Sequence, residues 1–497
     1  MKYHNPVIKG FHPDPSICRV GEDYYLVTSS FEYFPGIPIF HSRDLVNWTQ
    51  IGSCVKQSDQ FPLEKVQDSG GIWAPAIRYE KGRFYVTATL EYYGNFIISA
   101  EHPAGEWSPP VKVPMGGIDP SILFDGGKAY YCTNETLHPG VEEITAAEID
   151  VNTGVLIGDK RSLWRGIGGG FLEAPHLYHI GDWYYLMTAE GGTNFNHMVT
   201  IGRSRSVWGP YEGCPFNPIL TNVHDTGKEV QCSGHGDLLQ DHRGNWWMIH
   251  LAIRLARRTM SHLGRETFLT PVTWQDGWPM VAGNHKAVLN GEGPLWEEPK
   301  EPKEWKADFT GTDWEPEWIF LRNPLKDSYR RGQGKLRLYP SAVTLRDAGT
   351  PTFAAIRQRD FDCELFVEYI FAPVRDGDEA GIAIVLSSEF HYFIGKKRNL
   401  GQNTLVIEKR AEDFYQTPYQ EPIPDGKLRI KVKADKEYYT FYFAAGEEPL
   451  REICRASTRF LACEMAGKCF TGTVMGVYTA SLGETEAVME VTRFEML

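Results

Sequence analysis

The hydrophobic and polar positions of the first three hundred residues repeat in a common order. Each copy has a polar or small residue, a short apolar run, a tight turn with a charged residue, and then an aromatic-rich run. The copies are DPSICRVGEDYYLVTSS, WAPAIRYEKGRFYVTAT, DPSILFDGGKAYYCTN, EAPHLYHIGDWYYLMTAEG and GHGDLLQDHRGNWWMIHLA. Apolar runs on both sides of a tight turn predict a β-hairpin in each copy.

The spacing of the copies predicts how these hairpins assemble. They begin at residues 14, 73, 119, 173 and 234, so the intervals are 59, 46, 54 and 61 residues. This period suits four-stranded propeller blades with long loops and exceeds the roughly 20 to 45 residues of a solenoid repeat. Trp-bearing outer strands follow four hairpins, whereas the third has only residues 147–160 for this role. We predict a five-bladed β-propeller over residues 1–295; a sandwich or jelly roll of unrelated hairpins is the alternative.

The chain changes character after the last repeat. Residues 296–308 are rich in Pro, Glu and Lys without apolar periodicity, which is typical of a linker. Residues 309–497 contain short segments of alternating apolar and polar positions, such as AGIAIVLSSEFHYFIG, and few helical patterns. The sequence therefore predicts an all-β chain, in which a propeller is followed by a jelly-roll-like β-sandwich.

Composition narrows the classes of protein. The 497 residues carry 51 Lys and Arg against 64 Asp and Glu, a net charge of −13 without a dominant basic patch, which argues against nucleic-acid binding. No apolar run reaches the roughly 18 residues of a membrane span. The nine cysteines are scattered without a CxxC pair, so we expect buried thiols. With no visible secretory signal, this predicts a soluble cytoplasmic protein.

The residues that open the five copies are candidates for a shared site. They are Asp14, Trp73, Asp119, Glu173 and, in the fifth copy, His235. Innermost propeller strands line one central channel, so these side chains are expected to converge. An isolated Asp-Pro favours a turn and an isolated Trp a core, but acids in three of five copies favour a site. Confined carboxylates raise one another's pKa unless cations intervene, so one can stay protonated while another ionises, as glycoside hydrolysis requires.

Several motifs carry a family resemblance that covers almost the whole chain. They are NPVIKGFHPDPSI, SSFEYFPGIPIFHSRDLVNW, SGGIWAP, GIDPSILFDGGKAYY, LEAPHLY, YYLMTAEGGT, GHGDL and LGRETFL. Together they resemble glycoside hydrolase family 43, in particular its β-xylosidase branch with an appended β-sandwich. The resemblance implies inverting hydrolysis with Asp14 as general base, Glu173 as general acid and Asp119 as the carboxylate that keeps the acid protonated. Inversion would place the carboxyls of Asp14 and Glu173 roughly 6.5 to 9.5 Å apart.

The resemblance also implies which residues hold the sugar. Phe31 and Trp73 match pocket aromatics, whose rings suit the apolar faces of sugars. Arg265 matches an arginine that donates to hydroxyl groups, and its charge would help to hold a carboxylate ionised. His235 matches either the sole protein ligand of a hydrated Ca²⁺ in the channel or a direct hydrogen-bonding group. Phe470 matches an aromatic on a loop that the second domain places beside the pocket, and closure there would imply exo action.

Two pentosidase activities and one binding function remain open at this point. The leading hypothesis is a β-D-xylosidase that releases xylose from the non-reducing ends of xylo-oligosaccharides. An α-L-arabinofuranosidase acting on arabinose-bearing oligosaccharides, or a bifunctional enzyme, is the close alternative. A non-catalytic carbohydrate-binding propeller is disfavoured by the intact acids Asp14, Asp119 and Glu173. The chemistry requires no cofactor, no nucleic-acid or membrane partner is expected, and the sequence leaves a homo-oligomer open.

Overall fold

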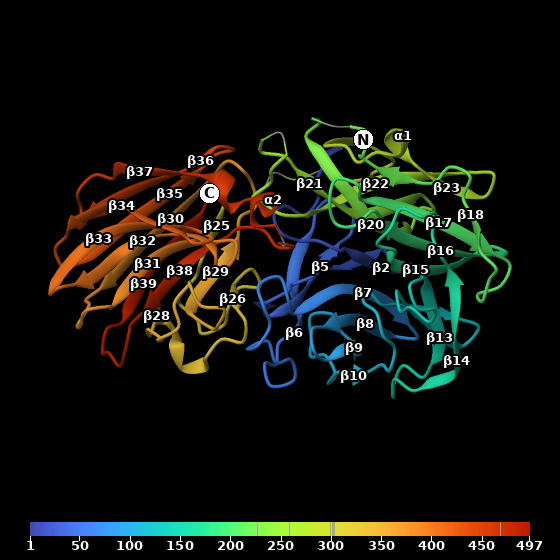
Figure 1. Cartoon of the computed structure of the whole chain (residues 1–497), viewed down its shortest axis with the longest axis horizontal. Coiled ribbons are helices and arrows are strands. Elements are labelled where there is room, and N and C mark those ends of the chain that lie inside the picture. The colour runs from blue at the N-terminus through green and yellow to red at the C-terminus, as the bar shows by residue number, and fades with distance from the viewer. Residues whose placement is uncertain (226, 258, 299, 301–303, 468) are drawn as a thin grey trace.

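The computed structural model describes residues 1–497 except 226, 258, 299, 301–303 and 468. Two β domains lie side by side, a propeller from the first part of the chain and a sandwich from the last (Figure 1). The predicted all-β fold class is confirmed. The helices among the described residues are α1 (Ala282–His285), α2 (Cys463–Ala466) and the 3₁₀ turns η1 (Lys326–Ser328) and η2 (Thr458–Leu461). None of them is long and apolar enough to span a membrane.

Five blades surround the channel, each a sheet with four strands in sequence order. Blade one has β2 (Ser16–Val20), β3 (Asp23–Val27), β5 (Gly36–Ser42) and β6 (Thr49–Val55). Blade two has β7 (Ile72–Glu80), β8 (Arg83–Leu90), β9 (Gly94–Ala100) and β10 (Val111–Lys112). Blade three has β11 (Ser121–Asp125), β12 (Lys128–Thr133), β13 (Ile144–Ile149) and β14 (Leu156–Trp164). The third blade, weakest in the sequence, therefore has a long outer strand.

The last two blades close the ring. Blade four has β15 (Glu173–Ile180), β16 (Trp183–Glu190), β17 (Met198–Ser204) and β18 (Glu212–Gly213), with β19 (Leu220–Thr221) also on β17. Blade five has β20 (Val230–Gln240), β21 (Trp246–Arg254), β22 (Glu266–Gln275) and β23 (Trp278–Val281). The first strand, β1 (Lys2–His4), pairs with β24 (Asn290–Glu292). The N-terminal segment thus joins the end of the propeller before it enters blade one.

Two sheets form the sandwich, and apolar side chains from both fill the space between them. The first contains, in spatial order, β27 (Tyr329–Gly332), β28 (Lys335–Leu338), β39 (Met489–Met496), β30 (Cys363–Phe371), β35 (Lys427–Ala434), β36 (Tyr438–Ala445) and β37 (Arg451–Ser457), with β25 (Trp305–Lys306) beside β39. The second contains β34 (Phe414–Pro422), β33 (Gln402–Ala411), β32 (Phe390–Asn399), β31 (Glu379–Val385), β38 (Val474–Ala480), β29 (Thr352–Arg357), β26 (Ile319–Leu321) and β4 (Tyr33–Phe34). The alternation along these strands produces one buried face on each sheet.

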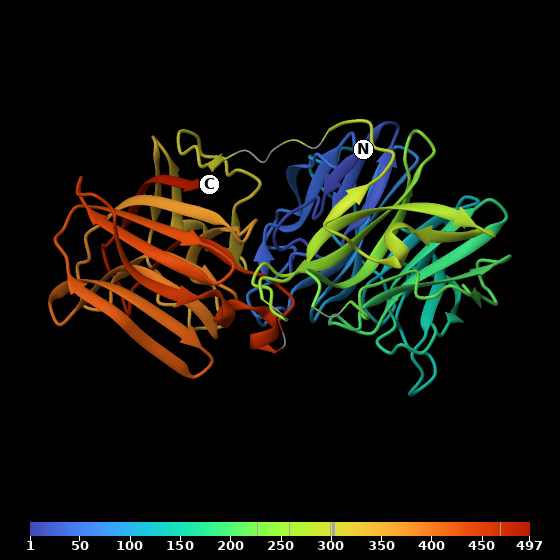
Figure 2. The ribbon, with the colours of Figure 1, turned by 90° about the horizontal axis from the view of Figure 1, so that it is seen from above.

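The domains share a sheet as well as a connecting segment. In the sequence, strand β4 comes between β3 and β5 of blade one. It nevertheless pairs antiparallel with β26 of the sandwich. Figure 2 shows the propeller and the sandwich side by side when the molecule is seen from above. Residues 299 and 301–303 of the predicted linker lie outside the described residues. Within that linker, the Trp296 indole donates to the Arg43 carbonyl at 3.1 Å, and β25 already pairs with the sandwich.

All nine cysteines are described and are free thiols. Six of them are buried, as expected, but Cys454, Cys463 and Cys469 are only partly buried. Cys463 is the first residue of α2 and Cys469 lies three residues after its end, at the side of the sandwich next to the propeller. The expectation of buried thiols was therefore wrong for these three residues.

Candidate active site

Left-handed backbone recurs in or next to the innermost strand of every blade. Asp14, Ala74, Asp119, Ala174 and His235 have φ values of 55°, 42°, 54°, 51° and 45°. Positive φ is uncommon outside glycine, so its recurrence in all five blades identifies structurally equivalent positions. Asp14, Asp119 and His235 occupy this position, as the sequence repeat indicated. Trp73 and Glu173 lie one residue earlier, which corrects the alignment of the five opening residues.

Asp14 is almost fully buried and holds three polar contacts. Arg265 Nη1 donates to Asp14 Oδ1 at 2.8 Å, and Ser29 Oγ donates to Oδ2 at 2.6 Å. His235 Nδ1 lies 3.6 Å from Oδ1. Burial alone would raise the pKa of Asp14, but the charge of Arg265, with help from His235 and the Ser29 hydroxyl, lowers the pKa below its usual value. The site therefore favours the ionised form of this carboxyl group.

The other two carboxyl groups shift in the opposite direction. Burial and the charge of Asp14 raise the pKa of Glu173 to about 7, against a lowering by Arg265. Burial and the charges of Glu173 and Asp14 raise the pKa of Asp119 well above its usual value. The first blade thus presents a carboxylate whose pKa is lowered to two carboxyl groups whose pKa values are raised. Such a separation of pKa values assigns acid and base chemistry to different residues.

Aromatic side chains from both domains stand beside these carboxyl groups. The Phe31 and Phe470 rings stack with centroids 6.3 Å apart and planes 26° from parallel. The Arg265 guanidinium carbon lies 5.7 Å from the centroid of the Phe31 ring and 5.8 Å from that of the Phe470 ring. Arg265 Nη2 also donates to the Phe470 carbonyl at 3.0 Å. One arginine therefore joins Asp14 in the propeller to the loop that the sandwich supplies.

Ser69 and Ser29 are further members of the site that the sequence analysis did not identify. Ser69 accepts a hydrogen bond from the Trp73 indole through its carbonyl at 3.3 Å and one from the Phe470 backbone N–H through Oγ at 2.9 Å. The Ser29 hydroxyl, which donates to Asp14, also accepts from the Ala74 backbone N–H at 2.6 Å. Ser69 and Ser29 are the first residues of the motifs SGGIWAP and SSFEYFPG, but only their contacts reveal a role.

Asp237 forms a second buried polar cluster deeper in the channel. It accepts hydrogen bonds from Ser16 Oγ of blade one at 2.7 Å, Arg78 Nη1 of blade two at 2.9 Å and Tyr178 OH of blade four at 2.6 Å. Its side chain is fully buried, and Arg78 also donates to His176 Nδ1 at 2.9 Å. This cluster links four blades beneath the site. Asp237 lies two residues after His235 in the GHGDL motif, and this motif was the feature of the sequence from which the cluster could have been predicted.

His235 is buried, and burial lowers its pKa against the opposing effect of the Asp14 charge, which favours the neutral imidazole. Among the described residues, no group of three or more His, Cys, Asp or Glu side chains could hold a metal ion. Calcium prefers six to eight oxygen ligands, so the protein groups around this lone imidazole fit such an ion only if water supplies most of the ligands. Calcium binding at His235 stays a prediction.

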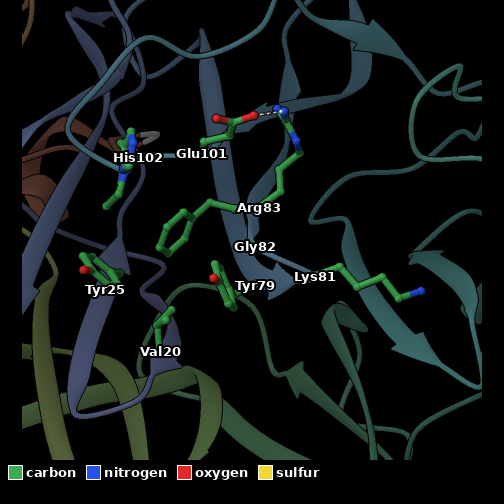
Figure 3. A pocket seen from close by; sticks show the side chains of 10 residues that line it. Val20, Tyr25, Tyr79, Lys81, Gly82, Arg83, Glu101 and His102 are labelled. Atoms are coloured by element: carbon green, nitrogen blue, oxygen red, sulfur yellow. Dashed lines mark hydrogen bonds and ion pairs between the residues drawn. The ribbon is translucent and has the colours of Figure 1, made fainter.

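A separate cavity of about 640 Å³ lies between the turns of the first two hairpins. Tyr25, Tyr79 and the Arg83–Glu101 ion pair line it (Figure 3). Strand β7 has Trp73 of the site near its start and ends near this cavity at Glu80, so the cavity lies at the opposite end of the hairpins. It contains none of the residues described above.

Hydrolysis of a glycosidic bond needs one carboxyl group as acid and another as base, so the pair formed by Glu173 and Asp14 points to the class of glycoside hydrolases. The chain belongs to glycosyl hydrolase family 43. The model of that family, described as "Glycosyl hydrolases family 43", matches residues 3–279. A second model, "Beta xylosidase C-terminal Concanavalin A-like domain", matches residues 306–496.

The relatives that resemble the whole chain include proteins named as arabinofuranosidases and proteins named as xylosidases. A "Non-reducing end alpha-L-arabinofuranosidase" of Bacteroides ovatus is 38% identical, over 97% of this chain and 92% of that protein. A "Beta-xylosidase" of Bacillus subtilis is 32% identical, over 96% of each. Among solved structures, a xylan beta-1,4-xylosidase of Bacillus halodurans has a TM-score of 0.94 and 30% identity over 99% of each chain. The "Bacteroides ovatus Xyloglucan PUL GH43B" structure has a TM-score of 0.95 and 36% identity over 100% of each.

Proposed function

We propose that this protein is an inverting exo-glycosidase that releases one pentose from the non-reducing end of a short oligosaccharide, with β-D-xylosidase activity as the leading assignment. The observation that carries the proposal is the opposite shift of two pKa values. Asp14 is held ionised by Arg265, whereas burial and the Asp14 charge raise the pKa of Glu173 to about 7. One group can accept a proton while the other donates one.

Each carboxyl group has one task in this mechanism. Asp14 accepts a proton from water as the water oxygen attacks the anomeric carbon. Glu173 donates its proton to the glycosidic oxygen, so the leaving sugar departs as a neutral alcohol. Asp119 and Glu173 oppose each other's ionisation, as the contribution of the Glu173 charge to the raised pKa of Asp119 indicates, so the two groups do not both ionise and the acid can keep its proton. The configuration at the anomeric carbon inverts because a single displacement replaces the leaving oxygen by the water oxygen.

The aromatic walls support exo action on a single terminal unit. Phe31 and Trp73 offer faces for the apolar side of a pentose. Phe470, on the loop from the sandwich, stacks beside Phe31, and we infer that it closes the pocket to the interior of a chain. The β4–β26 pairing holds this wall in place, which gives the sandwich a part in substrate binding.

The second candidate activity is α-L-arabinofuranosidase. The Bacteroides ovatus relative of that name, 38% identical over 97% of this chain, is the observation that favours it. The two pentoses present similar hydroxyl groups at the reaction centre, so one carboxylate set can serve both.

The test compares kcat/KM on an aryl β-D-xyloside and an aryl α-L-arabinofuranoside in one preparation. A larger value for the xyloside supports the leading assignment, and a larger value for the arabinofuranoside supports the second. Proton NMR of the first sugar formed reports its anomeric configuration, and retention would overturn the mechanism. Turnover of neither substrate would overturn the proposed function.

A further inference from the structure

Phe171 is an exposed aromatic residue in strained backbone immediately before the proposed acid. It lies between β14 and β15, two residues before Glu173, and its exposed fraction is 63%. Its φ is 52°, and among the described Phe, Tyr and Trp residues only Phe31 and Tyr92 also have a positive φ. Tyr92 lies in the hairpin turn between β8 and β9, where such backbone is ordinary. Phe31 lies in the proposed sugar pocket, so strained backbone there already presents a ring to substrate.

Hydrogen bonds to buried groups of the same blade hold the loop that carries Phe171. Glu190, which is buried, accepts hydrogen bonds from the Ile167 backbone N–H at 2.9 Å and the Gly169 backbone N–H at 2.7 Å. The Thr200 hydroxyl donates to the same carboxylate at 2.7 Å. The Gly170 carbonyl accepts from the Gly191 backbone N–H at 2.7 Å. A loop with this many anchors fixes the position of its next residue, and little conformational entropy is left to lose when a ligand binds.

The Phe171 ring rests on the neighbouring turn of the same blade. A Cβ atom on Gly192 would lie 3.2 Å from the ring, so the absence of a side chain there makes room for it. The Phe171 backbone N–H donates to Glu142 Oε1 at 3.0 Å. Glu142 is also one of the charges that raise the pKa of Glu173, after burial and Asp14. Phe171, Glu142 and the acid are therefore close neighbours at the open end of blade four.

The proposed reaction determines which sugar unit lies next to Phe171. The acid must touch the glycosidic oxygen, and that oxygen joins the terminal pentose to the unit that leaves. The terminal pentose lies toward Phe31, Trp73 and Phe470, so the leaving unit extends past Glu173 on the outer side. An exposed aromatic ring beside the acid there can stack on the apolar face of a pyranose.

We propose that Phe171 is the stacking platform for the leaving sugar and that the leaving unit is a β-linked pyranose. This inference rests on the proposed function, because it uses Glu173 as the acid. The fixed ring then selects oligosaccharides over glycosides with small leaving groups. Binding of the terminal pentose itself does not involve Phe171.

The test measures Phe171→Ala and Phe171→Trp on xylobiose and on an arabinofuranosyl xylo-oligosaccharide, with free xylose and free arabinose as competitive inhibitors. For the oligosaccharide that the wild type cleaves, Phe171→Ala should lower kcat/KM by roughly fivefold to tenfold. Phe171→Trp should keep the wild-type kcat/KM, because the indole can also stack on the sugar. The inhibition constant of the free pentose should not change, because a pentose alone occupies the inner pocket. Phe216→Ala, an exposed Phe after β18 of the same blade, is the matched control and should match wild type.

Two results would overturn the inference while leaving the proposed function intact. One is an unchanged kcat/KM for the oligosaccharide in Phe171→Ala. The other is an equal loss in pentose binding, which would place the ring against the terminal sugar. Wild-type turnover of aryl xyloside or arabinofuranoside, measured beside these, reports the proposed function separately, and its absence would overturn both. Far-ultraviolet circular dichroism and a thermal melt establish that each variant is folded.

Discussion

The Ser69 hydroxyl oxygen accepts a hydrogen bond from the Phe470 backbone N–H at 2.9 Å, across the boundary between the two domains. The carbonyl of the same serine accepts from the Trp73 indole. Ser69 thus fixes one pocket aromatic from the propeller and one from the sandwich. In the proposed function, the aromatic wall that limits the pocket to a chain end depends on this residue as well as on Arg265.

Replacing Ser69 by Ala should loosen the Phe470 loop without altering the carboxyl groups. We expect KM for xylobiose or the preferred oligosaccharide to rise by roughly threefold to tenfold, as one hydrogen bond to the loop is lost, with kcat nearly unchanged. Steady-state kinetics give both constants. A parallel fall in kcat would contradict a purely positioning role.

Replacing Glu173 by Gln should remove the proton donor while keeping its shape. We expect kcat on oligosaccharides to fall by about 10²- to 10⁴-fold. The loss should be smaller on an aryl glycoside with an acidic phenol, because that leaving group needs little protonation. The ratio of the two losses is the measurement, and equal losses on both substrates would count against Glu173 as the acid.

The pH dependence of kcat/KM should be bell-shaped with a plateau on the acidic side of neutrality. Asp14 must be ionised, and its lowered pKa places the rising limb below the usual range for aspartate. Glu173 must be protonated, so activity should fall as the pH rises through about 7. Arg265→Lys should move the rising limb upward, because a less well oriented cation stabilises the Asp14 carboxylate less. A falling limb that survives unchanged in Glu173→Gln would refute the assignment.

Replacing Asp237 by Ala should destabilise the propeller. The fully buried carboxylate pairs with Arg78, so the substitution leaves a buried guanidinium uncompensated, at a cost of about 3–5 kcal/mol. The expected result is a lower midpoint of urea unfolding, followed by tryptophan fluorescence. Asp182→Ala is the control, because the Asp182 side chain is 87% exposed and its ion pair with Arg205 lies on the surface. Equal stability of the two variants would contradict a role for the cluster in joining the blades.

The repeat in the sequence determined much of this protein by itself. Alternating apolar positions around tight turns predict hairpins from local physics alone, and five of them at a regular interval predict the propeller. The same repeat predicted that Asp14, Asp119 and Glu173 meet, because equivalent residues of a closed ring face one channel. It could not reveal that Glu173 and Trp73 lie one residue before the left-handed position, since that offset is a property of backbone angles.

Contacts between distant segments were decided only by the tertiary structure. Nothing local to Tyr33 and Phe34 indicates that they pair with Ile319–Leu321 in another domain, and nothing local to Ser69 indicates that it binds Phe470. The shifts that separate Asp14 from Glu173 likewise depend on burial and on Arg265, which lies 251 residues along the chain from Asp14. The sequence supplied the groups; the packing of blades and sandwich set their charges and their neighbours.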